Sequence, residues 1–153
     1  NFTDLMQGYV AIGQFEREYD SGDSTDGLAA SAALEWYITR LTTITLNGHR
    51  NSEENVGATA AVPFIEGEYG ARIDHELLRN VILTGGVQFG RREYETIDRD
   101  DEYVFAEVGA DWLINRHLVA RGRFVRDEVE SDGANAYRDY EENRFTPGLG
   151  ILL

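Results

Sequence analysis

The sequence predicts an all-β domain, built as an eight-stranded antiparallel up-and-down barrel, and three observations support this fold class. Apolar and polar residues alternate with a period of two over long stretches, which is typical of strands with one apolar face. Patterns with the helical period are hard to find in the 153 residues. The connections between the alternating stretches are of two kinds, short turns and longer acidic loops, and these kinds strictly alternate along the chain.

The alternation defines the eight strands in order. They are expected over residues 5–19, 27–39, 41–52, 61–75, 81–95, 101–114, 118–127 and 145–153. Residues 27–39 and 101–114 are the clearest, because Leu, Ala, Val, Trp and Ile occupy every second position there. The short connections are 39–41, 76–80 and 115–117, and the longer ones are 20–26, 51–59, 96–101 and 131–139. All of residues 1–153 are therefore expected to form a single domain.

The charge of the chain excludes several classes of function. There are 28 acidic residues against 14 basic ones, all of them arginine, which gives a formal net charge of −14. A nucleic-acid-binding protein needs a basic face, so no nucleic-acid partner is expected. The chain has no cysteine, which excludes disulfides and thiolate chemistry. The loop-end segments 19–27, 51–58, 93–102 and 127–142 hold 18 of the 28 acids, so the sequence predicts a nearly neutral barrel with an acidic loop end.

The apolar face of each strand is expected to contact lipid rather than a soluble core. Strands of this length are long enough to cross a bilayer when tilted, and their apolar faces contain much alanine and glycine, which would fill a water-soluble core poorly. Aromatic residues are expected in two bands at the two membrane interfaces. Trp36 and Trp112 lie near the short turns, and Phe15, Phe89 and Phe124 lie near the loops. The alternative is a soluble, lipocalin-like barrel with its apolar side chains inside.

The polar face carries charges of both signs, which are expected to pair across strands in the lumen. The lumen charge network predicted from parity consists of Glu16, Glu35, Glu66, Glu68, Arg72, Arg92, Glu107, Asp111, Arg121, Arg123 and Arg144. Eight strands enclose an interior that side chains just fill, so a closed barrel is expected to be plugged. The first and last strands are expected to pair, unless the chain assembles with copies of itself, because an open edge in lipid leaves backbone groups unsatisfied.

Several segments resemble the putative β-barrel porin family of bacterial outer membranes. They are residues 74–80 (DHELLRN), residues 139–144 (DYEENR), residues 41–46 (LTTITL) and the turn at Asn115 and Arg116. The resemblance implies a transmembrane barrel in the outer membrane of Gram-negative bacteria, with short periplasmic turns and longer extracellular loops. Members of this family often accompany exopolysaccharide or capsule genes and usually have more strands. The chain is therefore a compact relative or the C-terminal part of a larger barrel.

Catalytic and metal-binding residues are sparse. His49 is the one histidine expected near the loop end and on the polar face, which leaves a hydrolase as a minor alternative. The candidate ligands for a loosely bound Ca²⁺ or Mg²⁺ are Asp20, Asp23, Asp26, Asp98, Asp100 and Asp101, although their spacing does not match a calcium-binding loop. No catalytic residue and no tightly bound cofactor are expected.

The sequence thus predicts a non-enzymatic outer-membrane β-barrel with a structural, anchoring or porin-like role. The alternative is part of a wider pore that exports a polar solute or a polysaccharide. The expected partners are the lipid bilayer and lipopolysaccharide, with the acidic loops facing outward. Self-assembly or a larger outer-membrane complex is a further expectation.

Overall fold

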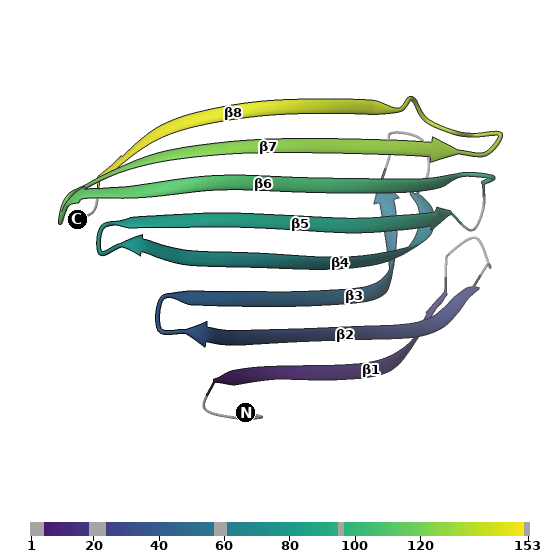
Figure 1. Ribbon diagram of the computed structural model, residues 1–153. Coiled ribbons are helices and arrows are strands. Elements are labelled where there is room, and N and C mark those ends of the chain that lie inside the picture. Colours follow the sequence, from purple (N-terminus) through teal and green to yellow (C-terminus); the bar gives the residue numbers. More distant parts are fainter. Residues whose placement is uncertain (1–4, 19–23, 57–60, 95–96, 152–153) are drawn as a thin grey trace.

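The computed structural model describes residues 5–18, 24–56, 61–94 and 97–151, and these form one eight-stranded sheet (Figure 1). The described residues contain no helix that is long and apolar enough to cross a membrane. The strands are β1 (Met6–Glu18), β2 (Ser24–Thr39), β3 (Thr42–Val56), β4 (Ala61–Leu78), β5 (Val81–Tyr94), β6 (Asp100–Asn115), β7 (Leu118–Asp132) and β8 (Tyr140–Ile151).

Each strand pairs antiparallel with the strands before and after it in the chain, in the order β1 to β8. This confirms the predicted fold class of eight antiparallel up-and-down strands. The two-residue turns lie at one end of the sheet and the longer connections at the other, as Figure 1 shows. Tight turns suffice because consecutive strands run in opposite directions.

The expected pairing of the first and last strands is not found among the described residues. The strand pairs run from β1–β2 to β7–β8, so β1 and β8 form the two edges of the sheet and lie at its opposite margins in Figure 1. Almost all residues of β8 are exposed. The alternation of side chains tells which face a residue lies on, but carries no information about the partner of an edge strand.

The strands extend further toward the loop end than the alternation of apolar residues indicated. β3 continues to Val56, β7 continues to Asp132 and β8 begins at Tyr140, so residues predicted as loops are paired strand residues. Strand ends that are rich in charged residues lack the apolar periodicity by which strands are predicted. The acidic end of the sheet is consequently built on strand ends as well as on loops, and Asp100 and Asp101 belong to β6.

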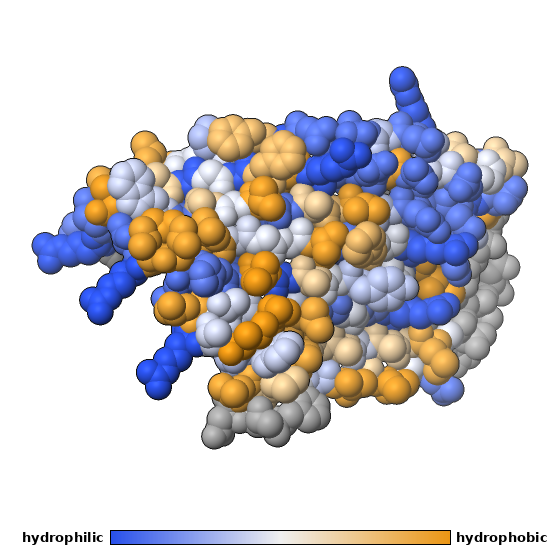
Figure 2. Space-filling view, in the orientation of Figure 1, coloured by the Kyte–Doolittle hydropathy of each residue, from blue (hydrophilic) through white to orange (hydrophobic). Residues whose placement is uncertain are grey.

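The predicted apolar parity forms one exposed face of the sheet, which we call the apolar face. Ile12, Val108 and Leu149 on this face expose 77%, 58% and 81% of their surface. In the view of Figure 2, hydrophobic residues cover much of the middle of the sheet, whereas hydrophilic ones gather at the loop ends of the last strands. Among the described residues, Phe64 and Val119 are the buried apolar side chains. A face this apolar and this exposed is the one expected to contact lipid.

The predicted interface aromatics whose side chains are described lie on this apolar face. Trp36, Phe89, Trp112 and Phe124 each expose between 41% and 52% of their surface, whereas the side chain of Phe15 lies outside the described residues. The boundary between apolar and charged residues shifts from strand to strand. Phe89 pairs with Val104, and Val104 pairs with Glu128 rather than with Phe124. Such a shift is expected of strands that tilt relative to the axis of a barrel.

Candidate functional site

The opposite face of the sheet, which we call the polar face, holds most of the predicted lumen charges. It is built by the other parity of each strand, so neighbouring strands place their polar-face residues side by side through the register. Thr45, Arg72, Gly86 and Glu107 form one such row across β3 to β6. Among the described residues, the direct contacts between the predicted lumen charges form three clusters.

The first cluster is centred on Arg72 of β4. Its guanidinium donates to both carboxylate oxygens of Asp74, at 2.8 and 3.0 Å, and to Oε1 of Glu107 on β6, at 3.0 Å. The Thr84 hydroxyl donates to Oδ1 of Asp74 at 2.8 Å. Gly86 lies between Arg72 and Glu107 in the row and has no side chain, so the two charged groups meet across β5. Fork-like contacts of this kind fix the orientation of the guanidinium.

The second cluster lies nearer the loops and surrounds Glu66, a carboxylate that exposes 7% of its surface. Arg92 donates to Glu66 Oε1 at 2.8 Å. The Tyr103 hydroxyl lies 3.1 Å from the same oxygen and 2.8 Å from Oε2 of Glu68. The guanidinium of Arg92 also lies over the Tyr103 ring, 4.8 Å from its centroid. Two glutamates two residues apart are thus held by one arginine and one tyrosine.

Gly90 creates the space for this second cluster. It is the register partner of Tyr103, and a Cβ atom at Gly90 would overlap the Tyr103 ring. The ring therefore lies flat across β5 and reaches the glutamates of β4. Glycine at this position thus permits the close approach of a neighbouring side chain.

The third cluster joins β6 and β7. Asp111 lies 2.7 Å from Nη1 of Arg123 and 3.5 Å from Nε of Arg121. Arg144 on the edge strand β8 has only a longer contact, 3.6 Å to Oε1 of Glu142. The two arginines of β7 share this aspartate, and Arg123 also lies in the same register row as Asp74.

The remaining predicted lumen residues behave differently. Glu35 accepts hydrogen bonds from the side chains of Gln7 and Tyr37 and has no arginine partner among the described residues. The side chain of Glu16 lies outside the described residues. Sequence reasoning missed Tyr103, because a tyrosine in an alternating strand gives no signal of the carboxylates that it will meet. Its parity, shared with Glu107, was the available clue.

His49 lies on the polar face with Glu68 as its neighbour, and Nδ1 of the ring is 3.7 Å from Oε1 of the carboxylate. Ser31 and Glu68 are its register partners on the two adjacent strands. Within the described part of the chain, no hydroxyl group donates a hydrogen bond to the imidazole. Among the described residues, the geometry is therefore that of a histidine beside a carboxylate.

The aspartates proposed as cation ligands do not converge in the part of the chain that the structure describes. Asp101 is buried and accepts from Arg99, from Tyr94 Oη at 3.2 Å and from Ser131 Oγ at 2.5 Å. The hydrogen bond to Asp101 raises the pKa of Arg99 further, so this pair stays charged. Two further candidates have other partners. Asp98 accepts the backbone N–H of Ala134, and Asp100 accepts a hydrogen bond from Arg91 of β5.

No group of three potential metal-ligating side chains occurs among the described residues. Asp20 and Asp23 lie outside the described residues, and the Asp26 side chain does too, although its backbone belongs to β2. Asp98 and Asp101 make hydrogen bonds that join β6 and the connection before it to β7 and the segment that follows it. The backbone at Gly133 has a positive φ of 108°, which a glycine adopts readily, and the Asp98 carbonyl accepts the N–H of Asn135 at 2.9 Å.

Comparison with known proteins places the chain in a family. The family model described as "Putative beta-barrel porin 2" matches residues 1–151. No curated protein and no solved structure matches the chain. The match covers all eight strands, and the arrangement of one exposed apolar face and one charged face is the arrangement expected of a porin wall. The chain belongs to the Putative beta-barrel porin 2 family.

Proposed function

We propose that the chain forms the wall of a water-filled barrel in the bacterial outer membrane, through which polar solutes pass. One observation carries this proposal: the ion pairs of the polar face remain partly exposed, while the face behind them is apolar. The side chains of Arg72 and Arg121 expose 46% and 51% of their surface, although each is paired. Charges that are paired and yet solvated suit the lining of an aqueous passage.

The exposed edges also favour a wide barrel. β1 and β8 have 13 and 12 residues, and along each strand one side of the backbone has no partner among the described residues. Every unsatisfied backbone group costs several kcal/mol in the hydrocarbon region. We propose that further strands satisfy these edges through self-assembly or within a larger outer-membrane complex. Such a barrel is wide enough for a channel, in contrast to eight strands alone.

The transported solute is proposed to be polar, and a polysaccharide chain is the export substrate that the polar face accommodates best. A cavity of about 230 Å³ on this face is lined by Tyr103, Phe105 and Tyr140 together with Gln88, Arg92 and Asp127. Aromatic faces beside hydrogen-bonding groups suit a sugar ring, which has both apolar and hydroxyl-bearing surfaces.

The orientation follows from the distribution of charge. We propose that the acidic strand ends and loops face outward, where they meet lipopolysaccharide and loosely bound Ca²⁺ or Mg²⁺, and that the short turns face the periplasm. Carboxylates attract such cations without a designed site. The family assignment supports the outer-membrane location.

Single-channel recording in planar lipid bilayers tests the proposed pore. The wild-type chain is expected to give stepwise currents, and replacing both Arg121 and Arg123 with Gln is expected to shift selectivity toward cations, because Asp111 is then unpaired. Replacing Arg91 with Gln is the matched control, since Arg91 lies on the apolar face and outside the passage. Currents no larger than leak would leave a structural or anchoring role and contradict transport.

A further inference from the structure

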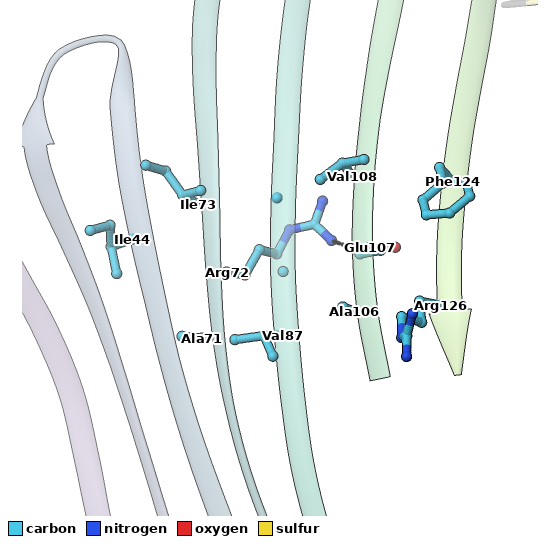
Figure 3. A pocket seen from close by; sticks show the side chains of 12 residues that line it. Ile44, Ala71, Arg72, Ile73, Val87, Ala106, Glu107, Val108, Phe124 and Arg126 are labelled. Atoms are coloured by element: carbon cyan, nitrogen blue, oxygen red, sulfur yellow. Dashed lines mark hydrogen bonds and ion pairs between the residues drawn. The ribbon is translucent and has the colours of Figure 1, made fainter. Parts of the chain in front are cut away.

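The apolar face contains one open groove, with a volume of about 630 Å³, over strands β3 to β7 (Figure 3). The floor of the groove lies below its margins because Ala71, Gly85 and Ala106 have small side chains or none. Larger side chains rise at its margins, among them Ile44 on one side and Phe124 on the other, as Figure 3 shows. Behind the groove, across the sheet, lies the ion pair of Arg72 with Glu107.

A charged residue closes the loop end of this groove. Arg126 follows Phe124 by two residues on β7, so both side chains are on the same face, and Arg126 lines the groove beside Ala106, its register partner. Its guanidinium contacts Glu128 at 3.0 Å and Glu141 at 3.1 Å. The apolar face changes at this level from hydrocarbon side chains to charged ones.

We propose that this groove binds one acyl chain of a phosphorylated glycolipid of the lipopolysaccharide type, with the phosphate of the head group at Arg126. The proposal rests on the outer-membrane location proposed above. The occupant follows from the lining, because an apolar groove facing lipid accepts a hydrocarbon chain and a guanidinium at its end accepts a phosphate.

The two glutamates beside Arg126 refine the head-group chemistry. One arginine and two glutamates give the mouth of the groove a net negative charge, which would repel a bare phosphate. Divalent cations bind jointly to carboxylates and phosphates, so the phosphate is expected to arrive with Mg²⁺ or Ca²⁺ bridging it to Glu128 or Glu141. The binding of this lipid is therefore expected to require both Arg126 and a divalent cation.

The chain provides a matched control for each part of the site. Gly122 is a second glycine of the apolar face that lies outside the groove, and a Cβ atom there meets nothing closer than 3.9 Å, against 3.4 Å at Gly85. Arg91 is a second arginine of the apolar face near the loops. It lies 3.3 Å from Glu93, 3.1 Å from Asp100 and 3.9 Å from Glu102, but does not line the groove.

The experiment measures equilibrium binding of a lipid A-type phosphoglycolipid to the detergent-solubilised chain in the presence of Mg²⁺. Gly85→Leu, which fills the groove, is expected to weaken binding about tenfold, and Gly122→Leu is expected to leave it unchanged. Arg126→Gln is expected to weaken binding about tenfold through the loss of a charge-assisted hydrogen bond, whereas Arg91→Gln is expected to have no effect. The dephosphorylated lipid is expected not to distinguish Arg126→Gln from the wild type.

Equal effects of the two leucine variants, or of the two glutamine variants, would overturn the proposal. Binding that survives removal of Mg²⁺ by a chelator would also overturn it, because the negative mouth of the groove then needs no bridging cation. Because the glutamine variants leave the apolar lining of the groove unchanged, they keep the test decisive if Gly85→Leu folds poorly. Failure here is distinct from failure of the proposed pore, which is measured as conductance.

Discussion

Gly90→Ala is the perturbation whose effect the structure defines most closely. A Cβ atom at position 90 would occupy the space of the Tyr103 ring, so the ring has to leave its place across β5. Its hydroxyl then loses the contacts to Glu66 at 3.1 Å and Glu68 at 2.8 Å, and Arg92 loses the ring 4.8 Å away. The added methyl group contacts no charged residue, yet it is expected to break the contacts that Tyr103 makes in the second cluster.

The size of the loss follows from these contacts. A hydrogen bond to a charged group contributes about 1.5–3 kcal/mol, and an exposed cation–π contact contributes about 0.5–1 kcal/mol. Tyr103 is half-buried and Glu68 is partly solvated, so water replaces part of what is lost. We expect Gly90→Ala to lower the free energy of unfolding by about 2–4 kcal/mol. The matched control is Gly13→Ala, also on the polar face, where nothing lies within 4 Å of the added Cβ.

Urea titration of the chain in detergent micelles, followed by tyrosine and tryptophan fluorescence, measures both variants. The double variant Gly90→Ala with Tyr103→Ala tests the cause, because Gly90→Ala is expected to cost little once the ring is absent. The reasoning is refuted if Gly90→Ala is no more destabilising than Gly13→Ala, or if its cost is unchanged in the Tyr103→Ala background.

Two further predictions concern the loop end and the polar face. Asp101→Asn removes the charge that holds Arg99 and is expected to lower the free energy of unfolding by about 2 kcal/mol and to speed proteolysis in the connection 133–139. An unchanged cleavage rate would contradict the proposed link between the two connections. Arg72→Gln leaves Asp74 and Glu107 without their cation and is expected to raise the permeability ratio of K⁺ to Cl⁻ several-fold in planar bilayers. A ratio that stays the same would place Arg72 outside the passage.

The number of strands and the assignment of faces could be predicted from the sequence, because both depend on the period of two that apolar side chains display. The strand ends beyond Ser52 and Asp127 could not be predicted, since charged residues are frequent there and apolar ones are few. The alternation also does not indicate whether β1 and β8 pair, and no such pairing is found among the described residues.

The partners within the candidate site were predicted only in part. Parity assigned Glu66 and Arg92 to one face, but their contact depends on the register between β4 and β5, which the turn between them sets. For the same reason the sequence did not indicate that Tyr103 would bind two glutamates, or that Glu35 would be held by uncharged partners. The period of two predicts which face of the sheet a residue lies on, whereas its side-chain contacts also depend on the register between neighbouring strands.

The central claim is that one face of the sheet contacts lipid and the other contacts water. Because the chain contains no cysteine, single cysteines can be introduced at successive positions of β6 from Val104 to Ile114 and tested in lipid vesicles with a charged, water-soluble maleimide. Labelling is expected at the odd positions, which share the polar face with Glu107, and not at the even positions, which share the apolar face with Trp112. The reverse alternation, or equal labelling at all positions, would contradict the claim.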